Sequence, residues 1–80
     1  MQQNNNTMEI MWDILASIYF GKCTYEELCK RDFLKTISEY GISICLQQLE
    51  VKGFIKINTK DEYVALASAK KELAKRGYFE

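Results

Sequence analysis

The stretch that most constrains the fold runs from Ser38 to Ile55. Its apolar residues recur at intervals of three and four, which places them on one side of an α-helix. They are Ile42, Cys45, Leu46 and Leu49. Gly53 follows Lys52, a pair typical of a helix C-terminus, where glycine accepts a positive φ and a cation lies near the free carbonyls. We therefore expect a helix over residues 38–52 that passes directly into a strand.

Two short strands should follow this helix, over residues 54–58 and 63–67, with residues 59–62 as the hairpin tip. Side chains alternate between the two faces of a strand, so Ile55 and Ile57 should share one face and Lys56 should lie on the other. A short extra strand near Cys23 can pair with this hairpin. The tip carries one cation and two anions.

A first helix should start near Asn6 or Thr7 and end at Gly21. Its apolar face is wide for a small core. The members of that face are Met8, Met11, Trp12, Ile14, Leu15, Ile18 and Tyr19. Ile10 falls outside this stripe. Two interpretations stay open: a well-buried helix, or a dimer contact that includes Ile10, Trp12 or Tyr19.

The second helix has the clearest start signal, because Thr24 and Glu27 have the spacing of a capping box. It should run from Tyr25 to Asp32 or Phe33, with Cys23 and Leu28 packing across its first turn. A turn over residues 33–37 then leads to the third helix, whose N-cap is either Thr36 or Ser38.

A last helix is expected over residues 68–76. Gly77 follows it at a position that favours a left-handed conformation, and Tyr78 can fold back on Leu73. Residues 1–6 form a polar, amide-rich stretch that can bury little, so we expect a flexible tail there and a single domain over residues 7–80.

The composition argues against several classes of function. The 80 residues carry 11 basic and 11 acidic side chains and no histidine. Without histidine, a glycine-rich phosphate loop or paired carboxylates in a predicted pocket, we expect no catalytic residues, no metal site and no cofactor. The three cysteines fit reduced, buried thiols. No apolar run suits a membrane span and no signal peptide is visible, so we expect a cytoplasmic protein.

The residues around the third helix carry a resemblance to a known family. Leu46, Leu49, Glu50, Gly53, Phe54 and Ile55 fit the pattern Leu-x-x-Leu-Glu-x-x-Gly-hydrophobic-Ile. The chain resembles the winged helix-turn-helix domains of small transcription regulators from prokaryotes, their viruses and plasmids, over about residues 8–73. The resemblance implies a mainly helical α+β fold with three helices, a two-stranded β-hairpin wing and a C-terminal helix. It also implies sequence-specific binding of double-stranded DNA by a homodimer.

The resemblance assigns the DNA contacts to the third helix, its preceding turn and the wing. The candidates are Lys35, Ser38, Tyr40, Ser43, Ile44, Gln47, Lys56 and Lys60. A glutamine amide at position 47 can read adenine, and lysines can bind phosphates. The candidates for a dimer contact are Ile10, Trp12, Tyr78 and Phe79.

Two features depart from the family pattern. Ile44 stands where the family often has a polar residue, and Glu39 and Glu50 outnumber Lys52 on the third helix. Net neutrality also counts against a large phosphate contact area. A second hypothesis therefore stays open, in which the same fold binds a protein partner around Tyr40 and Ile44 without binding DNA.

Overall fold

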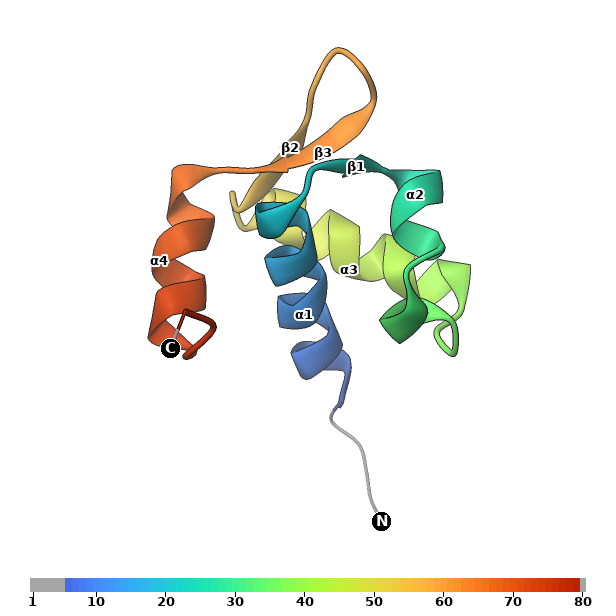
Figure 1. Ribbon diagram of the computed structural model, residues 1–80, viewed down its shortest axis with the longest axis horizontal. Helices are drawn as coiled ribbons and strands as arrows, with labels where there is room; N and C mark the ends of the chain where they lie inside the picture. Colours follow the sequence, from blue (N-terminus) through green and yellow to red (C-terminus); the bar gives the residue numbers. More distant parts are fainter. Residues whose placement is uncertain (1–5, 80) are drawn as a thin grey trace.

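The computed structural model describes residues 6–79, with side chains described from Glu9 onward. Over this range the chain forms an α+β fold that is mainly helical, as predicted (Figure 1). Its elements are α1 (Asn6–Phe20), β1 (Cys23–Thr24), α2 (Tyr25–Cys29), the 3-10 turn η1 (Asp32–Leu34), α3 (Glu39–Val51), β2 (Ile55–Ile57), β3 (Glu62–Ala65) and α4 (Ala67–Lys75). The predicted tail lies outside the described residues except for Asn6, which begins α1.

The three strands form one antiparallel sheet with the order β1-β3-β2. Cys23 lies opposite Tyr63, and Ile55 lies opposite Ala65. The extra strand predicted near Cys23 is therefore present and pairs with the hairpin. Figure 1 shows the sheet along the upper edge of the molecule, with the helices below it. α1 packs against α3 and α4.

The core lies where α1, α3 and the sheet meet, and it buries apolar residues of α1, α2, α3 and β2. Among them are Leu15, Ile18, Leu28, Ile42, Leu46, Leu49 and Ile55, each at most 2% exposed. Leu34 is also buried, at 1% exposed, although the sequence analysis placed it in a turn. The 3-10 turn η1 explains this, because it directs the Leu34 side chain into the core between two helices.

The capping box predicted at the start of α2 is present. Thr24 Oγ1 accepts from the Glu27 amide at 3.2 Å, and Glu27 Oε1 accepts from the Thr24 amide at 2.9 Å. The predicted end of this helix was wrong, because α2 stops at Cys29. The chain becomes extended at Arg31, whose guanidinium turns back and donates to the carbonyl oxygens of Ser17 and Gly21.

Arg31 satisfies the C-terminus of α1. α1 has no basic residue in its own last turn. Carbonyls at a helix C-terminus lack partners within the helix and favour a nearby cation. Arg31 supplies both the donors and the charge from a later segment of the chain.

Both α3 and α4 end in the same hydrogen-bonded turn with a glycine of positive φ. Gly53 has φ 81°, its amide donates to Glu50 and the Phe54 amide donates to Leu49, both at 3.0 Å. At the end of α4, Gly77 has φ 86°, its amide donates to Ala74 at 3.1 Å and the Tyr78 amide donates to Leu73 at 3.0 Å. These pairs of bonds define a Schellman motif, which the sequence analysis predicted for α4.

The strands β2 and β3 are shorter than predicted. The hairpin that they form projects beyond the helices (Figure 1). Ile57 is consequently 45% exposed, whereas Ile55, two residues earlier, is buried. The hairpin thus leaves the core between these two residues.

Candidate nucleic-acid interface

α3 presents an outward face because its opposite side is held in the core by four buried residues. On the outward face, Tyr40 and Val51 are each 76% exposed and Ile44 is 37% exposed. Ser43 and Gln47 are exposed beside them. The predicted helical contacts therefore lie together on one accessible surface. We call this surface, formed by Tyr40, Ser43, Ile44, Gln47 and Val51, the α3 face.

Ser38 has a structural task at the start of this helix. Its hydroxyl oxygen accepts from the Gly41 amide at 3.0 Å, so Ser38, and not Thr36, is the N-cap of α3. This bond satisfies one of the free amides of the first helical turn. The hydroxyl of this candidate DNA contact is thus already engaged within the chain.

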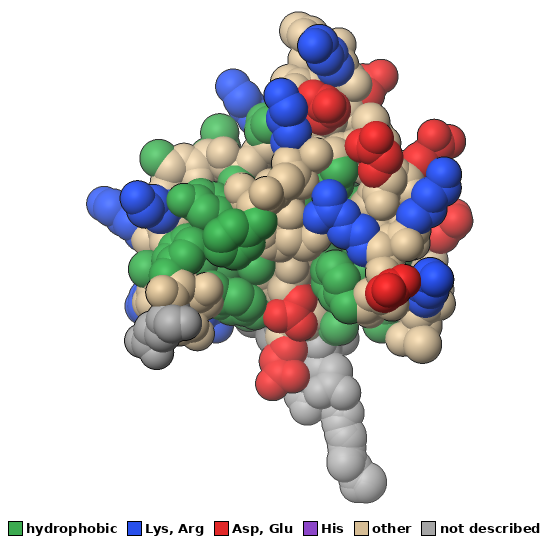
Figure 2. Space-filling view, in the orientation of Figure 1, with side chains coloured by type: hydrophobic (Ala, Val, Ile, Leu, Met, Phe, Trp, Pro, Cys, Tyr) green, Lys and Arg blue, Asp and Glu red, His purple; other side chains and the backbone are tan. Residues whose placement is uncertain are grey.

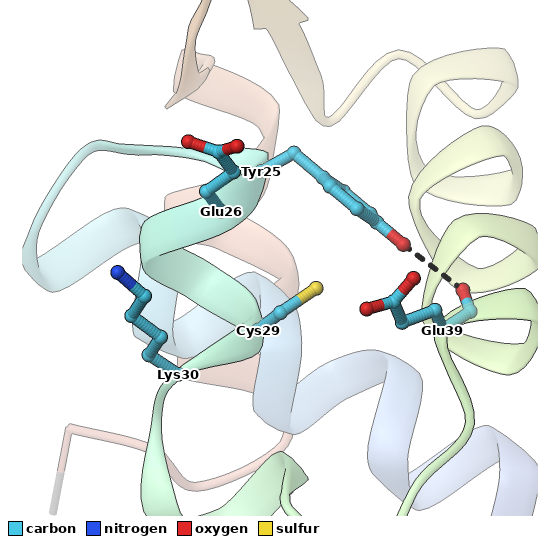
Figure 3. Close-up of a pocket in the computed structure, with 5 residues that line it drawn as sticks. All are labelled: Tyr25, Glu26, Cys29, Lys30 and Glu39. Carbon is cyan, nitrogen blue, oxygen red and sulfur yellow. Dashed lines mark hydrogen bonds between the residues drawn. The ribbon is translucent and has the colours of Figure 1, made fainter.

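Tyr25 links α2 to α3, as Figure 3 shows. Its hydroxyl donates to the Glu39 carbonyl oxygen at 3.2 Å and lies 3.2 Å from Ser43 Oγ. The Ser43 hydroxyl lowers the pKa of Tyr25, but burial and the neighbouring Cys29 and Glu39 raise it more, and the net direction is upward. Tyr25 therefore stays a neutral donor at physiological pH. The sequence analysis missed this residue, because helical spacing identifies neighbours along one helix only.

A hollow of about 350 Å³ lies between α2 and the start of α3. Its lining consists of Tyr25, Glu26, Cys29, Lys30 and Glu39. In Figure 3 the Cys29 sulfur points toward the gap between the two helices, while Glu26 and Lys30 extend from α2 on its outer side. The hollow holds two carboxylates against one ammonium group, which makes it a poor anion site.

The hairpin tip is held in one conformation by Asn58. Its Oδ1 accepts from the amides of Lys60 at 2.8 Å and Glu62 at 3.0 Å, and its Nδ2 donates to Glu62 Oε1 at 3.0 Å. Asp61 adopts φ 61°, a left-handed conformation that aspartate tolerates better than most residues. These contacts fix the backbone that carries Lys60 at the tip.

The lysines assigned to phosphate contacts have different surroundings. Lys35 forms an ion pair with Asp32 at 3.2 Å, in which both side chains are well exposed. Lys56 and Lys60 are exposed on the hairpin, and Lys60 shares a hollow of about 340 Å³ with Glu26 and Asp61. Exposed ion pairs are worth little, so Lys35 can exchange Asp32 for another anion at small cost.

The candidates for a dimer contact separate into buried and exposed residues. Trp12 is 7% exposed and packs edge-on against Phe54, with the Arg76 guanidinium 3.8 Å from its ring centre. Ile10 is half-buried against the core. Little surface of either side chain is therefore exposed for contact with a partner, and Trp12 exposes the least.

Tyr78 is engaged within the chain. Its hydroxyl donates to Asp13 Oδ1 at 2.6 Å, which ties the end of the described chain to α1. Burial and the Asp13 carboxylate raise the pKa of Tyr78 to about 12. Phe79, by contrast, is 41% exposed.

The cysteines lie in or beside the core. Cys23 and Cys45 are buried, and burial raises the pKa of each thiol, so both stay protonated. Cys29 is half-buried at the hollow between α2 and α3. Within residues 6–79, no group of three or more cysteine or carboxylate side chains is placed to hold a metal ion. Over the same range, no helix combines the length and apolar character needed to cross a membrane.

The search for similar proteins adds no family to this description: models of protein families, curated protein sequences and solved structures all give no match. The interpretation of the α3 face therefore depends on the residues and their geometry.

Proposed function

We propose that this chain is a winged helix-turn-helix domain that binds double-stranded DNA, with α3 in the major groove and the β2–β3 hairpin against the backbone. The observation that carries the proposal is topological. The elements follow the order α1-β1-α2-α3-β2-β3 with sheet order β1-β3-β2, and this arrangement leaves one side of α3 uncovered beside a projecting hairpin. The major groove is about 12 Å wide and admits one helix.

Different residues would have different tasks in that complex. Gln47 is exposed in the middle of α3, where its amide can donate to and accept from an adenine edge. Lys56 and Lys60 on the hairpin would contact phosphates. Such contacts fix the position of a protein on the duplex but do not read its sequence. Ile44 would touch a thymine methyl group.

The charge distribution predicts a modest electrostatic contribution to binding. Glu39 and Glu50 are exposed on α3, and Asp61 lies beside Lys60 at the hairpin tip. Each phosphate contact contributes nearly one unit to the slope of binding against salt concentration. A surface with few cations and several nearby anions should therefore show a shallow slope.

The test is a titration of labelled duplexes by fluorescence anisotropy at low and moderate salt. A duplex selected from a random library serves as the specific site, and an unselected duplex serves as background. Gln47→Ala should reduce the preference for the selected duplex more than it weakens background binding. Lys60→Ala should weaken both alike and flatten the salt dependence by about one unit.

Lys30→Ala is the matched control, because Lys30 is an exposed lysine next to α2 that belongs neither to the α3 face nor to the hairpin. It should leave both affinities unchanged. If the wild-type chain binds no duplex even at low salt, the DNA proposal fails.

A protein partner is the second candidate, and the apolar character of the α3 face favours it. Tyr40 and Val51 are strongly exposed, and an exposed apolar stripe is a common mark of a protein contact. A photoreactive phenylalanine derivative placed at Ile44 should then crosslink to one defined protein in nuclease-treated cells. The same probe at Ile57, a comparably exposed apolar position, should not.

A further inference from the structure

Three aromatic side chains meet on the surface where α1 ends. Tyr19, Phe20 and Phe79 contact one another edge-on, with ring centres 5.2, 5.4 and 5.8 Å apart. We call them the aromatic cluster. Phe20 is 66% exposed and Phe79 is 41% exposed. Figure 2 shows hydrophobic side chains gathered on one face of the molecule, over α1 and α4.

The two helices beside this cluster carry opposite charge. The described charged residues of α1 are Glu9 and Asp13, both acidic, and helical spacing puts them in line with Phe20. α4 and its C-cap are basic, with Lys70, Lys71, Lys75 and Arg76 against Glu72. An acidic helix and a basic helix thus lie side by side at the same face.

We propose that the aromatic cluster is the contact between two copies of this chain, in a two-fold dimer that lays α1 of one copy on α4 of the other. A two-fold contact uses the same surface on both partners. If the axis runs along the boundary between α1 and α4, each acidic α1 meets a basic α4. If the axis runs across that boundary, α4 meets α4 and the lysines repel one another.

The exposed aromatic area sets the strength of this contact. Phe20 and Phe79 together expose roughly 200 Å² per copy, taking about 200 Å² for a whole phenylalanine side chain. Two copies would bury roughly 400 Å² of aromatic surface, about a third of the smallest standard interface. The flanking surfaces of α1 and α4 supply the remainder, so the dimer should be weak and dependent on concentration.

This inference is independent of DNA binding, because neither α1 nor α4 contributes a residue to the α3 face. It also revises the candidates named from sequence. Phe79 and Tyr19, both considered from the sequence, stay in the contact, and Phe20 joins them. Trp12 leaves it because its side chain is already buried in the monomer.

The test is sedimentation equilibrium of the whole chain over a wide range of concentration. The wild type should show a monomer–dimer equilibrium that weakens as salt is added. Phe20→Asp should raise the dissociation constant at least tenfold. Its circular dichroism spectrum should stay that of the wild type, because Phe20 is mostly exposed. Ile57→Asp is the matched control, since Ile57 is an exposed apolar residue on the hairpin, and it should dimerise like the wild type.

Charge variants test the orientation. Glu9→Lys and Lys75→Glu should each weaken the dimer, and the double variant should recover it, because each changed α1 then faces a changed α4. If Lys75→Glu alone strengthens the dimer, α4 faces α4 and the proposed orientation is wrong. A wild-type chain that is monomeric at every concentration, or a Phe20→Asp variant that dimerises like the wild type, would overturn the contact itself.

Discussion

The two sides of α3 carry similar side chains and have opposite surroundings. On the inner side, Ile42, Cys45, Leu46 and Leu49 are at most 4% exposed. On the outer side, Tyr40 and Val51 are each 76% exposed. Hydrophobicity alone therefore does not decide which residues hold the fold together. The elements that cover the inner side of α3 decide this, and they leave its outer side accessible.

The largest expected difference between the two sides concerns stability. Leu49→Ala should lower the free energy of unfolding by about 2–5 kcal/mol, because it removes a side chain that is fully buried. Val51→Ala, two residues later on the outer side, should change it by less than about 0.5 kcal/mol. Urea denaturation of both variants measures the contrast. Equal losses would mean that the outer side also contributes to the core.

Loss of the Ser38 hydroxyl, which is exposed but bonded to the backbone, should have an intermediate effect on stability. Ser38→Ala should cost about 1 kcal/mol, because the Gly41 amide loses its acceptor at the start of α3. Thermal unfolding followed by circular dichroism is a suitable measurement. Ser38→Asp keeps an acceptor at the N-cap and should restore most of the loss. No recovery would assign the effect to something other than the cap.

A smaller loss of stability than at Ser38 is expected at neutral pH for Tyr78. Tyr78→Phe removes the hydrogen bond to Asp13 and should cost roughly 0.5–1 kcal/mol, since Tyr78 is partly exposed. Folding raises the pKa of Tyr78 from 10.0 to about 12. The stabilisation by the neutral phenol is therefore complete below pH 10 and is lost as the pH rises from 10 toward 12.

Denaturant titrations across this alkaline range compare the wild type with Tyr78→Phe. Other tyrosine and cysteine side chains with raised pKa titrate in both chains, so the difference between the two curves isolates Tyr78. The curves should converge as the pH rises. A constant separation up to pH 12 would contradict the assigned pKa.

The sequence predicted the fold well where the signals were local. The capping box at Thr24, the stripe ending at Leu49 and the glycine at position 53 all describe contacts within a few residues. The predicted end of α2 was wrong, because Arg31 leaves the helical path to reach the C-terminus of α1. No local sequence pattern indicates that these two segments contact each other.

The candidate sites show the same division. Helical spacing placed Tyr40, Ile44 and Gln47 together, and the structure brings them to one surface. Spacing could not reveal that Tyr25 reaches Ser43 from another helix. Nor could it show Phe20 beside Phe79, because their proximity depends on how the chain turns after α4.

The join between α3 and β2 has a mechanical consequence. Only residues 52–54 separate the helix from the strand, and each of their amides donates to a carbonyl in the last turns of α3, on Gln48, Glu50 and Leu49. The Phe54 and Gly53 carbonyls accept in turn from the Leu66 amide and the Ser68 hydroxyl. No residue in the join is free to act as a hinge. We therefore expect the helix and the hairpin to move together as one unit, so that in the proposed complex a change of shape needed for a close fit would fall to the DNA.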